Sequence, residues 1–243
     1  RRWEVKQIFG AECTGGILIV TGRDNGMKKI LKTFILFMLI LGVVFTTVNT
    51  SVTTVQAAST RTKAMNAYRK FLKKGKFTAS NGRTYNIYGF TVIDINKDRV
   101  PELIIESADT KSISVFTYKK GKVKILSDWI GQVWTQYKGK DYIEYNSSQK
   151  ALVIRTHGGT GLSGYDLISY KKGKLYTKLS IDMSSYWMNG KVISRYSYSK
   201  QNGNSRNCSY KTYKKLRKQY FSGKKVRKYY FARNTAAKRN KLR

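Results

Sequence analysis

Short runs in which aromatic or β-branched residues alternate with polar ones fill the chain from Phe77 to about Ser199, and they constrain its fold more than any other feature. Alternation with a period of two places one set of side chains on each face of a β-strand. Lys-Gly and Asn-Gly pairs separate the runs at YKKGKV, YKGKDY, YKKGKL and MNGKVI. Glycine supplies the positive φ that a tight hairpin requires. We therefore expect a series of antiparallel strands.

One hairpin sequence is repeated. Residues 115–123 (VFTYKKGKV) match residues 167–175 (LISYKKGKL), with identical Tyr, Lys, Lys, Gly and Lys at an offset of 52. That period is typical of a propeller blade or a sheet repeat, although two copies cannot close a propeller. Alternatively, Tyr-Lys hairpins recur because they turn well and stay soluble. The predicted fold is α+β and β-dominated, built as an antiparallel sheet or a partial propeller-like β-meander.

An amphipathic helix is predicted on each side of the strands. Residues 61–75 place five apolar side chains at helical spacing, and Gly75 is a C-terminal stop. Those side chains belong to Ala64, Met65, Tyr68, Phe71 and Leu72. Residues 209–222 form the second helix, with Ser209 as N-cap and Gly223 as the stop. Its apolar face comprises Tyr210, Tyr213, Leu216, Tyr220 and Phe221.

An export signal is predicted upstream of the first helix. The uncharged apolar run over residues 34–45 follows a lysine cluster after Met27 and is shorter than the roughly 20 residues of a spanning helix. Val55 and Ala57 supply the small side chains that signal peptidase accepts, so we expect a signal peptide over residues 27–57 and cleavage after Ala57. An uncleaved anchor would need the apolar run to continue through hydroxylated residues.

These signals divide the chain. Residues 1–26 are expected to be translated upstream sequence or residues added to the chain. After the signal peptide, residues 58–76 carry the first helix, residues 77–200 form the β-rich domain, and residues 201–243 form the C-terminal helix and a basic tail. We expect no transmembrane span in the exported part, and we expect the last ten residues to be mobile.

Cysteine and histidine usage limits the chemistry of the exported part. Cys208 is its single cysteine, so no intramolecular disulfide forms there, and a thiol packed in a helix is expected. With His157 as the single histidine, the usual zinc ligand sets are excluded. His157-Gly-Gly is similar to an esterase oxyanion loop, but Ser163 lacks the glycine two residues later that a nucleophile elbow needs, since Tyr165 stands there. A glycine-rich loop between strands is the better interpretation.

The segment from Asp94 to Glu102 has the spacing of a calcium loop. Oxygen ligands at alternate positions, from Asp94, Asn96, Asp98, the carbonyl of Val100, and Glu102, can surround a hard cation. Five of the ten acidic residues of the exported part fall between positions 94 and 109. Carboxylates so close together repel each other unless a cation lies among them.

Over residues 90–105 the chain resembles the calcium-binding strand-loop-strand of FG-GAP or VCBS-type repeats, which implies a bound calcium ion. The whole chain is similar to small exported proteins of unknown function from Gram-positive bacteria. Arg99 occupies the usual glycine position, where an L-residue costs roughly 1 kcal/mol or more. An EF-hand is excluded because Ile105 stands at its twelfth position. The alternative is an Asx-rich hairpin turn whose acids pair with nearby lysines.

Positive charge dominates the chain, with a formal net charge of +35, or +31 after Ala57. The segment from Lys211 to Arg243 holds fourteen Lys and Arg and no acid, interleaved with tyrosines. Such a segment binds phosphate-rich polymers with a steep salt dependence. The predicted polyanion-binding residues are Lys214, Lys215, Arg217, Lys218, Lys224, Lys225, Arg227 and Lys228. The alternative is a solvated lysine-rich face.

The leading functional hypothesis is an exported, non-catalytic binding or structural protein, secreted or associated with the cell envelope, with calcium organising one loop. Its expected partners are anionic wall polymers or membrane headgroups. An extracellular nucleic-acid binder is the first alternative, since the tyrosines offer stacking platforms. A divergent wall hydrolase is the second, with Glu102, Glu106, Asp141 and Glu144 as the available carboxylates.

Overall fold

The computed structural model describes residues 59–159, 161–201 and 203–242. The chain divides into two compact units, Arg1–Val55 and Gln56–Arg243, and every described residue belongs to the second. The upstream segment over residues 1–26, the signal peptide over residues 27–57 and the cleavage site after Ala57 all lie outside the described residues.

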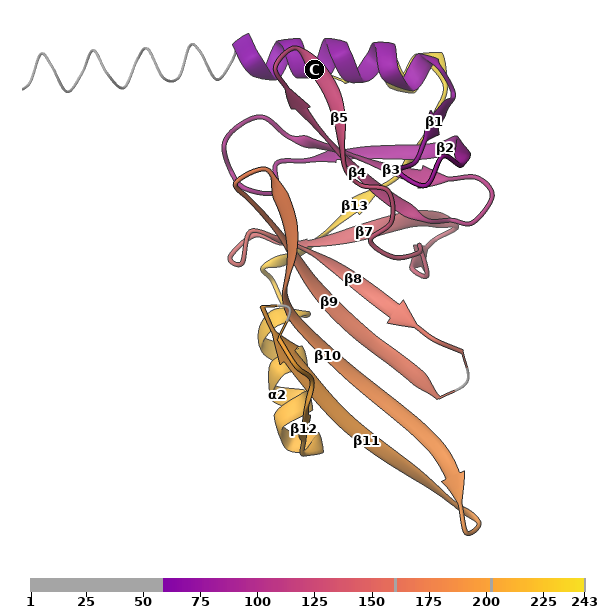
Figure 1. Ribbon diagram of the computed structural model, residues 1–243, viewed down its shortest axis with the longest axis vertical. Helices are drawn as coiled ribbons and strands as arrows, with labels where there is room; N and C mark the ends of the chain where they lie inside the picture. Colours follow the sequence, from indigo (N-terminus) through magenta and orange to yellow (C-terminus); the bar gives the residue numbers. More distant parts are fainter. Residues whose placement is uncertain (1–58, 160, 202, 243) are drawn as a thin grey trace, which may run out of the picture. The chain divides into compact units, whose positions relative to one another are not determined.

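Two antiparallel sheets make up the second unit (Figure 1). In the first sheet the strands follow one another in the order β1-β2-β3-β4-β5, and β14 pairs with β2. Its strands are β1 (Lys76–Thr78), β2 (Thr84–Ile93), β3 (Glu102–Ser107), β4 (Ile113–Lys119), β5 (Lys122–Ser127) and β14 (Ala232–Arg233). Strands β1 to β5 are neighbours in sequence order, so this part of the sheet is a meander. The end of the chain adds β14, which pairs with β2.

The second sheet has the order β12-β11-β10-β9-β8-β7-β13, with β6 paired to β7. Its strands are β6 (Gln136–Tyr137), β7 (Lys140–Asn146), β8 (Ala151–His157), β9 (Leu162–Lys171), β10 (Lys174–Met188), β11 (Lys191–Lys200), β12 (Arg206–Cys208) and β13 (Val226–Tyr230). The prediction of a β-dominated α+β fold with antiparallel strands is therefore confirmed.

The four predicted hairpin turns share one backbone geometry. Lys120-Gly121, Lys138-Gly139, Lys172-Gly173 and Asn189-Gly190 each have two consecutive residues with positive φ. This is the pattern of a type I′ turn, whose twist matches that of the flanking strands. The repeated sequence forms two hairpins of the same kind, one in each sheet, so the repeat reflects a shared turn within a meander.

Three hydrophobic clusters order the unit into four layers. The helix over residues 59–73 packs on one face of the first sheet, through a cluster that includes Tyr68 and Leu103. The opposite face of that sheet meets the second sheet in a cluster that includes Ile104 and Ile154. The helix α2 (Tyr210–Tyr220) covers the far face of the second sheet. Central strands are consequently buried on both faces.

Both helices begin and end close to where the sequence predicts. The first ends before Gly75, whose φ is +70° and whose N–H donates to the Leu72 carbonyl at 3.1 Å. Ser209 caps α2 by accepting a hydrogen bond from Thr212 N. Tyr210, on the predicted apolar face of α2, is 57% exposed, and its ring packs on Tyr196 as the Tyr213 ring does.

The end of the chain is folded, contrary to the expected mobility. β13 pairs with β7 of the second sheet, and β14 then pairs with β2 of the first. The short helix α3 (Ala236–Asn240) follows, and Leu242 is buried in the first cluster. Asn234 Nδ2 donates a second hydrogen bond to the Leu72 carbonyl at 3.0 Å, which ties the end of the chain to the end of the first helix.

The placement of Cys208 also differs from the prediction. Its free thiol lies in β12, where it is partly buried against the third cluster, and not in a helix. The helix begins two residues later, because Ser209 is a better N-cap than cysteine. No helix within residues 59–242, apart from the undescribed positions 160 and 202, is long and apolar enough to cross a membrane.

Candidate functional site

The predicted calcium loop connects two central strands, β2 and β3, of the first sheet. Buried tyrosines hold both of its ends from opposite faces of that sheet. Tyr145 Oη donates to the Ile95 carbonyl at 3.1 Å, and Tyr68 Oη donates to the Pro101 carbonyl at 3.0 Å. These anchors fix the path of the loop between the two strands.

Within the loop, the polar side chains accept hydrogen bonds from the backbone. Asp94 accepts from Asp98 N at 3.1 Å and from Arg99 N at 3.0 Å. Asn96 Oδ1 accepts from Asp98 N, and Asp98 Oδ1 accepts from Val100 N at 2.8 Å. Bonds from an Asx side chain to a backbone N–H two residues later are those of Asx turns. The loop therefore has the internal bonding of the Asx-rich alternative.

Two basic residues of the loop adopt left-handed conformations. Lys97 has a φ of +66° and Arg99 has a φ of +74°, so Arg99 takes the left-handed conformation that favours glycine. The Lys97 Nζ lies 5.1 Å from the centroid of the Tyr145 ring. The strain expected at Arg99 is thus present, and the lysine charge points toward an aromatic face.

Glu102, the last predicted ligand, lies beneath the loop with 1% of its surface exposed. Its Oε2 accepts from Ile95 N at 3.1 Å. Burial, together with the negative charges of Asp98 and Asp94, raises the pKa of Glu102 to about 8. Within the described residues, no three His, Cys, Asp or Glu side chains converge on one point as a metal site would require. A calcium ion would need Glu102 to lose its proton and the loop carboxylates to turn inward.

All eight predicted polyanion-binding residues are exposed. Lys214, Lys215, Arg217 and Lys218 lie on α2, Lys224 and Lys225 lie in the turn after it, and Arg227 and Lys228 lie on β13. In the described part of the chain, none of the eight forms an ion pair. Their charges therefore face solvent without compensation.

The register of β13 divides this set. Val226 packs against the α2 side of the second sheet, so Lys228 shares that side and Arg227 points to the other. We define the basic face as the seven residues other than Arg227, which the structure separates from them. The members of the basic face are Lys214, Lys215, Arg217, Lys218, Lys224, Lys225 and Lys228.

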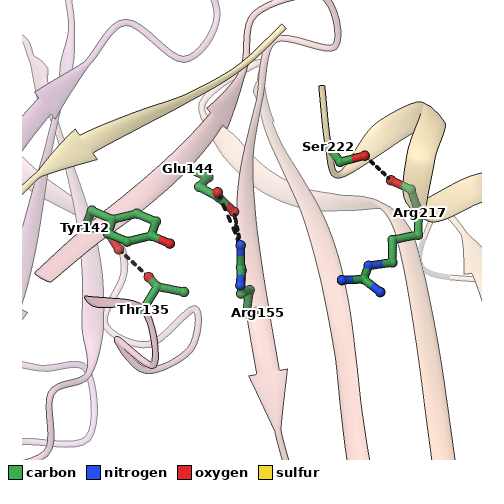
Figure 2. A network of polar contacts seen from close by, with 6 residues as sticks. All are labelled: Thr135, Tyr142, Glu144, Arg155, Arg217 and Ser222. Carbon is green, nitrogen blue, oxygen red and sulfur yellow. Dashed lines mark hydrogen bonds and ion pairs between the residues drawn. The ribbon is translucent and has the colours of Figure 1, made fainter. Parts of the chain in front are cut away.

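Aromatic rings and one ion pair border the basic face. Figure 2 shows the ion pair between Glu144 on β7 and Arg155 on β8, and it shows Arg217 on α2. Arg155 Nη2 lies 3.2 Å from Glu144 Oε2. The guanidinium groups of Arg155 and Arg217 lie 5.8 and 5.3 Å from the centroid of the Tyr165 ring. Because Glu144 neutralises Arg155, the uncompensated charge on this border belongs to Arg217.

Lys228 lies between two tyrosine rings. Its Nζ is 4.5 Å from the centroid of Tyr137 and 4.6 Å from that of Tyr142. Thr135 Oγ1 donates to the Tyr142 carbonyl at 2.7 Å, as Figure 2 shows, and this bond ties the preceding loop to β7. The Lys228 ammonium group therefore lies against one face of each of these two rings.

Sequence reasoning missed a contact between two carboxyl groups, Glu106 on β3 and Asp141 on β7. Glu106 has no exposed surface, and no N–H or O–H group of the described residues reaches its carboxyl oxygens. Burial and a hydrogen bond with Asp141 raise the pKa of Glu106 to about 8. A proton on Glu106 supplies the donor that this contact needs. The available signal was the alternation in β3, which places Glu102, Ile104 and Glu106 on the face toward the second sheet.

The carboxyl pair borders a cavity of about 350 Å³ lined by Tyr88, Gly89 and residues of β13 and β14. A Cβ at Gly89 would lie 3.2 Å from Glu106 Oε2, so glycine leaves room for the carboxyl. Glycosidases hold their carboxyl groups roughly 5 Å or more apart, with the sugar between them. Two carboxyl groups within hydrogen-bond contact leave no such space, which argues against this pair as a glycosidase site.

The His157 loop does not assemble a catalytic triad. His157 and Ser163 are cross-strand partners in β8 and β9, but no hydrogen bond joins them in the described part of the chain. Asp182 pairs with Gly164 and therefore points to the opposite face of the sheet from Ser163. The Trp134 ring lies 5.6 Å from the His157 ring, so the histidine packs on an aromatic side chain.

Comparison with known proteins adds no relative: no protein-family model matches the chain, and neither a curated protein nor a solved structure is significantly similar to it.

Proposed function

We propose that this protein is an exported, non-catalytic binding protein of the cell envelope that attaches to anionic polymers through its basic face. The observation that carries the proposal is that seven cationic residues are exposed and form no ion pair among the described residues. Apolar contacts of Tyr213 and Phe221 fix α2 on the second sheet. A rigid support holds the charges at constant spacing, which lowers the conformational cost of binding a polymer.

The chemistry of the basic face favours phosphate-rich chains. Lysine presents a compact charge that contacts phosphate as a point charge, and six of the seven residues are lysines. Each phosphate contact releases condensed counterions, so the affinity falls steeply with salt. In a Gram-positive envelope the abundant polymers of this kind are teichoic acids. The export signal over residues 27–57 is part of this proposal.

Calcium is the second part of the proposal. The ion would take oxygen atoms from Asp94, Asn96, Asp98, the carbonyl of Val100, and Glu102. Hydrogen bonds from the Asp98 N–H to Asp94 Oδ1 at 3.1 Å and to Asn96 Oδ1 at 3.2 Å already hold these two oxygen atoms at the same backbone group. Calcium at this loop would stabilise the junction between β2 and β3, far in sequence from the basic face.

The test is cosedimentation with purified teichoic acid at increasing salt. Changing Lys214, Lys215, Lys218 and Lys224 to Gln removes four charges from the basic face. The control changes the four exposed lysines of the β4–β5 hairpin, Lys119, Lys120, Lys122 and Lys124, to Gln, which gives the same net charge. We expect the first variant to lose up to about 3 from the slope of log affinity against log salt, and the control to lose much less.

Equal losses in the two variants would show that net charge alone drives binding, and the basic face would then have no specific role. Single-stranded DNA in the same assay tests the nucleic-acid alternative. Binding to DNA that is tighter than binding to teichoic acid, with quenching of tyrosine fluorescence, would favour that alternative. Release of soluble fragments from purified walls would favour a hydrolase.

A further inference from the structure

The hairpin of β10 and β11 continues beyond the rest of the second sheet. Ser184 is the last β10 residue that pairs with β9, and β12 pairs with β11 only at Tyr196, Ser197 and Tyr198. Beyond Ser185 the two strands pair only with each other, up to Met188 and Lys191. Figure 1 shows this two-stranded ribbon extending past the end of β9. At the rise of a β-strand it projects about 13 Å.

The tip of this ribbon is apolar on both faces. Trp187 is 75% exposed, and its cross-strand partner Val192 is 58% exposed. Met188, on the opposite face by the alternation of the strand, is 49% exposed, and Ile193 shares its face. A segment that docks on a protein surface is usually apolar on the one face that contacts its partner. A tip with apolar residues on both faces suits an apolar medium that contacts both faces.

Positive charge borders the apolar tip. Lys191 and Arg195 are exposed on β11, and the guanidinium of Arg195 lies 5.1 Å from the centroid of the Tyr186 ring. From Met183 to the end of the chain the sequence has no Asp or Glu. Lys191 pairs with Met188 beside the turn, at the end of the ribbon, whereas Arg195 lies farther from the end than the apolar residues. A ribbon with exposed tryptophan and tyrosine and these two cations suits a bilayer with anionic headgroups, because a lysine extends its charge to the headgroups while its aliphatic stem stays in apolar surroundings.

We propose that the β10–β11 tip, residues 186–193, inserts into the interfacial region of an anionic lipid bilayer. The projecting length suits the depth of roughly 5–10 Å that interfacial segments reach. Trp187, Met188 and Val192 would enter among the acyl chains. Arg195 would contact the headgroups directly, and Lys191, which pairs with Met188 at the end of the ribbon, would reach them by extending its side chain. The type I′ turn at Asn189-Gly190 pairs its flanking residues, so few backbone groups remain open at the inserted end.

This inference adds a lipid contact at a site separate from the basic face and does not depend on polymer binding. The probe is vesicles of equal parts phosphatidylglycerol and phosphatidylcholine, assayed by cosedimentation. The double variant Trp187→Ser/Val192→Thr should bind them more than tenfold more weakly than the wild type. The matched control is Trp129→Ser, because Trp129 is also 64% exposed but lies outside the ribbon. It should bind the vesicles as the wild type does.

Quenching by brominated lipids measures insertion directly. In the wild type, tryptophan fluorescence should fall in brominated vesicles; in Trp187→Phe most of that quenching should disappear while binding persists. Wild-type affinity in the Trp187→Ser/Val192→Thr variant, or undiminished quenching in Trp187→Phe, would overturn the inference. If the double variant loses vesicle binding but keeps teichoic acid binding, the two contacts are independent. A wild-type protein that binds vesicles but does not bind teichoic acid would refute only the proposed function.

Discussion

The buried contact between Glu106 and Asp141 predicts that the protein loses stability as the pH rises. Glu106 has no exposed surface, and only 9% of the Asp141 side chain is exposed. In an unfolded chain Glu106 would titrate near 4.5, whereas in the folded protein its pKa is raised to about 8. Between these values the folded protein holds a proton that the unfolded chain releases. The stabilisation is fully present below pH 4.5 and is lost as the pH rises through about 8.

The magnitude follows from proton linkage. One such group contributes a slope of about 1.36 kcal/mol per pH unit to the free energy of unfolding, and at most about 5 kcal/mol over the whole interval. Glu102, whose pKa burial also raises to about 8, contributes a second slope of the same sign. The substitution Glu106→Gln replaces the protonated carboxyl by an amide that still donates to Asp141. We expect this variant to show about half of the wild-type slope.

Urea unfolding followed by tryptophan fluorescence, at pH values from about 5 to about 9 and constant ionic strength, measures this slope. At about pH 9, Glu106→Gln should exceed the wild type in free energy of unfolding by about 2 kcal/mol or more. The control Asp109→Asn removes an exposed carboxyl and should retain the wild-type slope. If Glu106→Gln has the same slope as the wild type, Glu106 is not protonated in the folded protein, and the account of the carboxyl pair fails.

Two further predictions concern the loop and the end of the chain. Calcium should bind more tightly as the pH rises, by about tenfold per pH unit below 8, because Glu102 must lose its proton to act as a ligand. Calorimetry on the wild type and on the variant Asp94→Asn/Asp98→Asn measures this binding. An absence of heat from the wild type at about pH 9 would contradict the prediction. Leu242→Ala should lower the free energy of unfolding by about 2 kcal/mol, since Leu242 is buried in the first cluster, whereas Leu162→Ala, at an exposed position, should change it little. A denaturation midpoint unchanged in Leu242→Ala would show that the end of the chain does not support the core.

The sequence predicts those parts of the fold that depend on neighbouring residues. The hairpins could be predicted because a type I′ turn needs two positive φ values, and Lys-Gly or Asn-Gly pairs mark them locally. The same holds for the cap of α2 at Ser209 and for the Asx turns of the loop, in which each side chain bonds to a backbone group within five residues.

The remaining contacts connect distant parts of the chain, and local patterns do not encode them. β13 pairs Val226 with Asn146, and β14 pairs Ala232 with Phe90, although VRKYY carries no clear alternation. The contact of Glu106 with Asp141 depends on the packing of the two sheets, which no local pattern specifies. For that reason the acidic cluster around Asp94 suggested a single metal site, whereas two of its members lie in the core.

The position of the acids bears on the proposed binding function. Ten acidic residues follow Ala57, and three of these ten are buried: Glu102, Glu106 and Glu144. Because the pKa values of Glu102 and Glu106 are raised to about 8, both are neutral at pH 7, and the folded protein is two charges more positive than the formal count of +31. A more positive surface attracts polyanions at longer range. The same burial that makes stability fall with pH therefore raises the net positive charge of the folded protein at pH 7, and attraction to an anionic polymer should weaken as these two carboxyls ionise above about pH 8.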